Sequence, residues 1–128
     1  MRKVMLIVLL AFVSSNAMAE WKNVFKNDSS SIYIDFSTVR RAGDMVKFWQ
    51  LIDYKTAQNM DKNSYSSIRS LNQIDCKEER KKVLYGAFHS GHMANGNLIY
   101  IISEPLDWEP IPPGTLYSIL LKSFCNKK

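Results

Sequence analysis

The stretch MVKFWQLIDYK, residues 45–55, is the clearest β-strand in the sequence. Its large apolar residues fall on both faces of a strand: Val46, Phe48, Ile52 and Tyr54 on one face, and Met45, Trp49 and Leu51 on the other. A strand with two apolar faces lies inside a sheet or meets a partner subunit. We therefore expect this strand at the centre of a sheet, and we also expect that it can form a homodimer interface.

Alternation of polar and apolar residues predicts further strands on both sides of this one. The expected strands cover residues 21–25, 31–36, 65–76, 80–89 and 98–102. Ser37 is placed to cap a single helical turn that ends at Gly43-Asp44. The polar composition of residues 56–64 predicts a loop, and residues 90–97 predict a turn.

The C-terminal tail changes from a period of two to a helical period. Residues 110–114 read PIPPG, which is an extended connector that cannot be helical. Thr115 is a suitable N-cap for a helix that begins directly after it. The apolar stripe behind Thr115 has helical spacing: Tyr117, Leu120, Leu121, Phe124 and Cys125. The sequence therefore predicts an α+β fold, with a mostly antiparallel sheet of about five to six strands and one C-terminal helix.

The sequence contains two cysteines, Cys76 and Cys125. In an oxidising compartment an even pair is expected to form a disulfide, whereas two free thiols would be usual in the cytosol. A Cys76–Cys125 disulfide would join the C-terminal helix to the end of the strand over residues 65–76.

The N-terminus has the three parts of a secretory signal peptide. Arg2 and Lys3 are the positive region, residues 4–13 are apolar, and Ala17-Met18-Ala19 fits a cleavage site. We expect cleavage before Glu20, so that residues 1–19 are a signal peptide and residues 20–128 form one exported domain. The apolar run is too short to span a membrane. No cysteine follows the cleavage site directly, so we expect no lipid anchor.

The chain has a net charge of +5, of which Arg2 and Lys3 contribute two charges. An exported basic protein is expected to meet a protein or an anionic glycan as its partner, and we expect no nucleic acid partner. Residues 77–82 form a charged run that is either a solvated strand edge or part of a contact face. The contact face would consist of these residues on neighbouring strands: Arg69, Arg80, Lys81, Lys82, Tyr65 and Tyr85.

Two histidines, His89 and His92, stand in the predicted turn. A metal site needs three or four ligands, and the sequence places no carboxylate or free thiol beside them, so we expect no metal and no cofactor. An acid–base pair in a small periplasmic or secreted hydrolase is the alternative function. The sequence also lacks the common nucleophile, nucleotide and zinc-protease motifs. A binding protein, not an enzyme, is therefore the expected function.

An ordered series of short motifs resembles one known family. The motifs are YID at residues 33–35, WQLIDYK at 49–55, YSS at 65–67, DC at 75–76, GHM at 91–93, and WEPIPPGT at 108–115 before a helix that closes on Cys125. Their order and the cysteine positions are similar to the surface-adhesin protein E family of Gram-negative bacteria.

The resemblance implies a small antiparallel sheet with a C-terminal helix, a Cys76–Cys125 bridge, and dimerisation. It also implies adhesion, because the family's namesake is an outer-membrane lipoprotein that binds host matrix and serum proteins. This sequence departs from the namesake in lacking the lipidation cysteine. We therefore expect location in the periplasm, at the cell surface or outside the cell.

Overall fold

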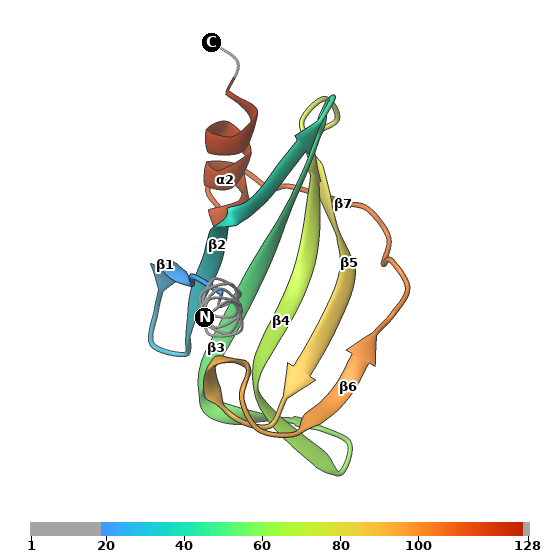
Figure 1. Ribbon diagram of the computed structural model, residues 1–128. Helices are drawn as coiled ribbons and strands as arrows, with labels where there is room; N and C mark the ends of the chain where they lie inside the picture. Colours follow the sequence, from blue (N-terminus) through green and yellow to red (C-terminus); the bar gives the residue numbers. More distant parts are fainter. Residues whose placement is uncertain (1–18, 127–128) are drawn as a thin grey trace, which may run out of the picture.

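The computed structural model describes residues 19–126 and has the α+β architecture that the sequence predicts. The expected signal peptide lies outside this range except for Ala19. One antiparallel sheet holds all the strands in the order β1-β2-β3-β4-β5-β6, with β7 on the edge of β5 (Figure 1). The strands are β1 (Lys22–Lys26), β2 (Ser30–Ala42), β3 (Met45–Met60), β4 (Asn63–Asp75), β5 (Arg80–His89), β6 (Leu98–Ile102) and β7 (Glu109–Pro110). The helices are the short 3-10 helix η1 (His92–Ala94) and α2 (Leu116–Cys125).

Strand β3 lies in the interior of the sheet, between β2 and β4, which confirms its predicted central place. Each strand pairs with the next one along the chain, so the sheet is a simple meander. Both faces of β3 are covered in part by the chain itself, because Phe48 and Leu51 on opposite faces are fully buried. Trp49 beside them is only half-buried.

The helical turn expected after Ser37 is wrong, because β2 continues as a strand to Ala42. The register between β2 and β3 shifts between Asp35 and Arg40, which marks a bulge. At the bulge the main-chain N–H and the hydroxyl of Ser37 both donate to Asp35 Oδ1, and the Thr38 hydroxyl donates to the Asp35 carbonyl. These local bonds are the ones that a capping residue makes at a helix start. Here they stabilise an irregularity within a strand.

The polar loop expected over residues 56–64 is also wrong. Strand β3 runs on to Met60 and β4 starts at Asn63, so these residues are the two arms of a tight hairpin. Asp61 in the turn has a positive φ of 53°, a conformation that Asp tolerates better than most residues. The arms lack apolar alternation because both of their faces are largely exposed.

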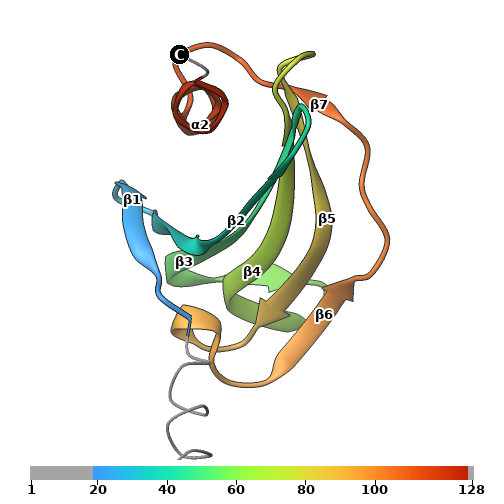
Figure 2. The same cartoon turned by 45° about the horizontal axis from the view of Figure 1, so that its top comes forward.

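Helix α2 packs on one face of the sheet and completes the core (Figure 2). Leu120 is buried against Ile34, Phe48 and Ile74 from three different strands. The ring of Phe124 lies 5.1 Å from that of Phe48. Thr115 caps the helix as predicted, since its hydroxyl accepts a hydrogen bond of 3.3 Å from the main-chain nitrogen of Ser118.

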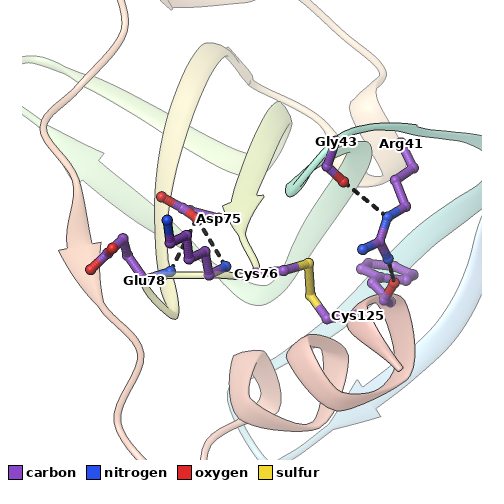
Figure 3. Close-up of a disulfide and its surroundings, with 8 residues drawn as sticks. Arg41, Gly43, Asp75, Cys76, Glu78 and Cys125 are labelled. Carbon is purple, nitrogen blue, oxygen red and sulfur yellow. Dashed lines mark hydrogen bonds between the residues drawn. A yellow bond between two sulfur atoms is a disulfide. The ribbon is translucent and has the colours of Figure 1, made fainter. Parts of the chain in front are cut away.

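The predicted disulfide joins Cys76, just after β4, to Cys125 at the end of α2 (Figure 3). The two Cα atoms lie 5.6 Å apart, within the usual range for a disulfide. Arg41 ties the same end of the helix to the sheet, because its guanidinium donates 2.9 Å to the carbonyl of Phe124 and 3.2 Å to that of Gly43. The helix is therefore held by apolar packing, by a covalent bond and by a charged donor.

The outer edge of β5 is shared by two short strands. β6 pairs with its C-terminal half and β7 with its N-terminal end. Between them the connector crosses the edge, where the main-chain nitrogen of Leu106 donates 2.8 Å to the carbonyl of Val83. This connector brings Trp108 beside β5.

In the part of the chain that the structure describes, no helix is long and apolar enough to cross a membrane.

Candidate binding face

The face of the sheet opposite α2 carries a row of cations that crosses four strands. Phe48 points to α2, so its neighbour Lys47 points to the other side. Residues paired across strands share a face. Lys47 pairs with Arg40 on β2 and with Gln73 on β4, and Gln73 pairs with Lys82 on β5. Arg40, Lys47 and Lys82 thus lie in one line across the sheet.

A band of large apolar side chains runs parallel to this row, two residues further along the strands. Trp49 on β3 pairs with Leu71 on β4, and Leu71 pairs with Tyr85 on β5. The rings of Trp49 and Tyr85 meet edge to face at 5.8 Å. On the side of the band away from the cationic row, the guanidinium of Arg69 lies 5.2 Å from the centre of the Trp49 ring, a cation–π contact.

Trp108 extends the face beyond β5. The guanidinium of Arg80 lies 4.4 Å from its ring centre, and the ammonium of Lys82 lies 4.5 Å from it. Arg80 also donates from Nε to Oδ2 of Asp75 at 3.0 Å. Together these residues form the cationic–aromatic face: Arg40, Lys47, Trp49, Arg69, Leu71, Arg80, Lys82, Tyr85 and Trp108.

Asp75 lies on the same face, two residues from Gln73 on β4, but it is covered, since only 4% of its side chain is exposed. Burial by itself raises the pKa of this carboxyl. Hydrogen bonds from the main-chain nitrogen of Glu78, from Arg80 and from the main-chain nitrogen of Lys77 outweigh the burial and hold the pKa below its usual value. Asp75 therefore anchors Arg80 in an ion pair and offsets part of its positive charge.

The structure divides the residues that the sequence grouped as a contact face. Arg69, Arg80, Lys82 and Tyr85 lie on the cationic–aromatic face, as described above. Lys81 points to the helix side, where its ammonium lies 4.5 Å from the ring centre of Tyr117 and 3.4 Å from Glu109 Oε1.

Tyr65 also lies off this face. Its ring packs between those of Tyr54 and Phe88, at 5.9 and 4.9 Å, near the β3–β4 turn. These contacts belong to a series of edge-to-face pairs that ends at Tyr100 on β6.

Sequence reasoning missed five members of this face: Arg40, Lys47, Trp49, Leu71 and Trp108. The alternation of residues 45–55 places Lys47 on the same face as Trp49, so the sequence alone could have predicted that Lys47 belongs to the face. Arg40 was hidden by the mistaken helical turn. The contact of Trp108 with Arg80 and Lys82 depends on where the connector crosses the edge of β5, which no local pattern encodes.

The two histidines have different surroundings. His92 lies with Nδ1 3.3 Å from Oδ1 of Asp53, a carboxylate that β3 brings to the turn and that the sequence did not place there. Both ring nitrogens of His89 are buried and have no hydrogen-bond partner within residues 19–126. Burial, and then the positive charge of Arg69, lower the pKa of His89.

The histidine turn is held by hydrogen bonds to two strands. The main-chain nitrogen of Met93 donates 2.7 Å to Asp53 Oδ1. The hydroxyl of Ser67 donates 2.6 Å to the carbonyl of Gly91 and accepts 2.9 Å from the nitrogen of Ala94. Ser67 and Asp53 therefore act as structural supports. Among residues 19–126, no group of three or more His, Cys, Asp or Glu side chains is placed to hold a metal ion.

Comparison with known proteins decides the family. The family model of surface-adhesin protein E matches residues 21–126, nearly all of the described chain. The chain belongs to the surface-adhesin protein E family. No curated protein matches its sequence.

The fold of this surface-adhesin protein E family member is also that of solved structures of Haemophilus influenzae protein E. One of them superposes with a TM-score of 0.61 at 14% sequence identity, covering 85% of this chain and 86% of the other. A second crystal form gives a TM-score of 0.64 at 14% identity, with coverage of 85% and 89%. At this identity the likeness concerns the fold.

Proposed function

We propose that this adhesin-family protein binds an acidic partner, a matrix protein or an anionic glycan, through its cationic–aromatic face. The observation that carries the proposal is the strand register, which gathers five cations and two aromatic rings, Trp49 and Tyr85, on the face that α2 leaves open. The cations are Arg40, Lys47, Arg69, Arg80 and Lys82. The family match supports an adhesin-like role.

Most of these cations keep their charge available for a ligand. Arg80 pairs with Asp75 through Nε alone. Arg40, Lys47 and Lys82 form no ion pair with a carboxylate of residues 19–126. Such a face speeds the encounter with an acidic partner, and its attraction weakens as salt screens it. The half-buried rings of Trp49 and Tyr85 supply contact area that charge alone cannot supply.

The protein would do this work after export, with residues 1–19 removed and without a lipid anchor. It would then act as a binding protein in the periplasm, at the cell surface or outside the cell. The mature domain would carry the face on its own, because every cation of the face lies between residues 40 and 82.

The proposal is tested with a paired charge reversal and a matched control. Lys47→Glu with Lys82→Glu reverses two charges in the centre of the row, while Lys22→Glu with Lys26→Glu reverses two exposed lysines on β1. Binding of matrix proteins and sulfated glycans is measured for both variants and for wild type by surface plasmon resonance at two salt concentrations. We expect loss of binding and of its salt dependence only in the first variant. Equal binding by both variants would place the site elsewhere.

A small hydrolase remains the second candidate, favoured by one observation. Asp53 lies within 3.3 Å of His92, and a carboxylate can orient a histidine that acts as a general base. Substitution of His89 and His92 separates the two functions, because hydrolysis would be lost while binding to the cationic–aromatic face would remain.

A further inference from the structure

We infer that the ligand of the cationic–aromatic face is a linear sulfated glycan that lies across the strands. Its sulfates would contact Arg40, Lys47 and Lys82, and its sugar rings would lie against Trp49 and Tyr85. This inference rests on the proposed function and names the partner class for the same site.

The first argument is the direction of the cationic row. Arg40, Lys47 and Lys82 occupy paired positions on β2, β3 and β5, with Gln73 of β4 between the two lysines. Neighbouring strands lie about 4.8 Å apart, so the row extends over roughly 14 Å at right angles to the strands. Charges in a line of this length match a chain that carries an anion on successive sugars. Gln73 adds an uncharged hydrogen-bonding group inside the row.

The second argument is the aromatic band beside the row. Trp49, Leu71 and Tyr85 run parallel to the cations, two residues along the strands, which is about 7 Å. A sugar has an apolar C–H surface on its ring and carries its sulfate at the rim. A sulfated chain lying along the two parallel rows would therefore contact both. Carboxylates of an acidic peptide stand on flexible side chains and need no such band.

The third argument is the position of the hollows, which lie away from the centre of the row. Protein partners draw most of their affinity from a few side chains held in well-packed pockets. In residues 19–126, one hollow lies beside the disulfide, between Cys76 and Leu121, and another lies beside Trp108. The hollow at Trp108 is also lined by Glu78 and Glu109, which would repel an anion. A strip of charge and apolar surface that runs across the strands suits a chain ligand better than a folded protein.

The test compares two polyanions of similar charge. The probes are a size-defined heparin oligosaccharide and a polyglutamate peptide, titrated by calorimetry into the mature protein over a series of salt concentrations. For wild type we expect the heparin oligosaccharide to bind about tenfold more tightly or better. Lys47→Gln with Lys82→Gln should weaken it at least about tenfold. The slope of the logarithm of the binding constant against the logarithm of the salt concentration should become shallower by about two, as for other linear polyelectrolytes that lose two cationic contacts.

The aromatic arm uses Tyr85→Leu, which keeps the apolar bulk and removes the ring. We expect this substitution to weaken binding of the heparin oligosaccharide several-fold and to leave polyglutamate binding unchanged. Lys22→Gln with Lys26→Gln on β1 is the matched control and should change neither. Thermal unfolding of each variant checks that the fold is intact.

The outcomes separate this inference from the proposed function. Equal affinity for the two polyanions, with no effect of Tyr85→Leu on either, would overturn the inference of a sulfated glycan. It would instead assign an acidic protein as the ligand of the same face. If the loss of Lys47 and Lys82 leaves the binding of both polyanions unchanged, the cationic–aromatic face is not the binding site. The proposed function would then be overturned as well.

Discussion

The main-chain nitrogen of Glu20 donates a hydrogen bond of 3.1 Å to Oδ2 of Asp35, a residue that is only 4% exposed. Asp35 stands at the bulge of β2 and also accepts bonds from Ser37. If the signal peptide is cleaved after Ala19, the nitrogen of Glu20 becomes the α-ammonium group of the mature chain. Processing would then replace an uncharged donor to a buried carboxylate by a charged one, and so form an ion pair at the bulge of β2.

The mature chain that begins at Glu20 is therefore expected to be more stable than the same chain acetylated at that nitrogen. Acetylation keeps the N–H donor to the carboxylate and removes only the charge, and an ion pair of an exposed group contributes about 0–1 kcal/mol. Urea unfolding near pH 6 measures the difference, and intact mass verifies the terminus. In an Asp35→Asn background acetylation should have no effect. A mature mass that retains part of residues 1–19 would contradict the premise.

Stability is expected to fall in acid because of two buried carboxylates. The pKa of Asp35 is lowered, since bonds from Ser37 and from the nitrogen of Glu20 outweigh the burial that by itself raises it. The pKa of Asp75 is lowered in the same way. A group whose folded pKa is below its unfolded value stabilises the fold above the unfolded value, near 4, and loses that contribution as pH falls through the folded pKa.

Free energies of unfolding measured between neutral and acid pH check this expectation. Asp75→Asn should be less stable at neutral pH and should show a shallower decline in acid. An unchanged pH profile in this variant would assign the acid sensitivity to other groups.

Removal of the disulfide is expected to lower the free energy of unfolding by about 4 kcal/mol. Cys76 and Cys125 are 49 residues apart in sequence, and the loop-entropy model gives this value for a loop of that size. Guanidinium unfolding of Cys76→Ser with Cys125→Ser, compared with oxidised wild type, measures it. The apolar contacts of Leu120 remain in the variant, so α2 should still form. Loss of much less stability would mean that apolar packing alone holds the helix in place.

The strands that the sequence predicted best are those whose residues alternate between a buried and an open face. Strands β5 and β6 have the predicted bounds, and α2 starts after the predicted cap Thr115. Residues 38–42 and 56–60 were missed because few of their side chains are buried, and backbone pairing with a neighbouring strand holds them in place. Local propensity cannot reveal pairing between distant segments.

The composition of the candidate face depends on bulges that alternation does not reveal. Simple alternation along β5 would place Lys81 and Tyr85 on one side. The register with β4 shifts between Leu71 and Asn72, which inserts one extra residue in β5 and brings Tyr85 to the side of Lys82. The same kind of irregularity in β2 fixes the position of Arg40 opposite Lys47. The sequence supplied the residue types, and the register selected which of them act together.

The homodimer expected through β3 would use the same face, because Trp49 belongs to the cationic–aromatic face and the opposite side packs on α2. A two-fold contact there would bring Lys47 and Lys82 near their own copies. We therefore expect a dimer that strengthens as salt screens this repulsion and that dissociates when a polyanion is added. Light scattering at micromolar concentration, with and without salt, measures this. A dimer insensitive to salt and to Lys47→Glu would instead implicate β6, where Leu98, Tyr100 and Ile101 are exposed.

Substitution of both histidines by alanine is expected to leave binding intact. His92 is mostly exposed and its contact with Asp53 is a long 3.3 Å, so its loss should cost well under about 1 kcal/mol of stability. Asp53→Ala should cost more, because it also removes the acceptor of the Met93 nitrogen. That bond helps to hold Met93 and Ala94 at positive φ values of 55° and 62°, which non-glycine residues adopt only under constraint.

Three measurements distinguish a binding protein from a hydrolase: a binding titration, thermal unfolding, and assays with a panel of hydrolase substrates. Each is made on wild type, on the double histidine variant and on Asp53→Ala. A binding protein predicts unchanged affinity in the double histidine variant and weakened turn structure only in Asp53→Ala. A wild-type hydrolytic activity that disappears in the double variant, with no change in affinity or melting temperature, would instead assign catalysis to this turn. Both ring nitrogens of His89 are buried without a hydrogen-bond partner in residues 19–126, so on this structure a substrate would reach His92 more easily than His89.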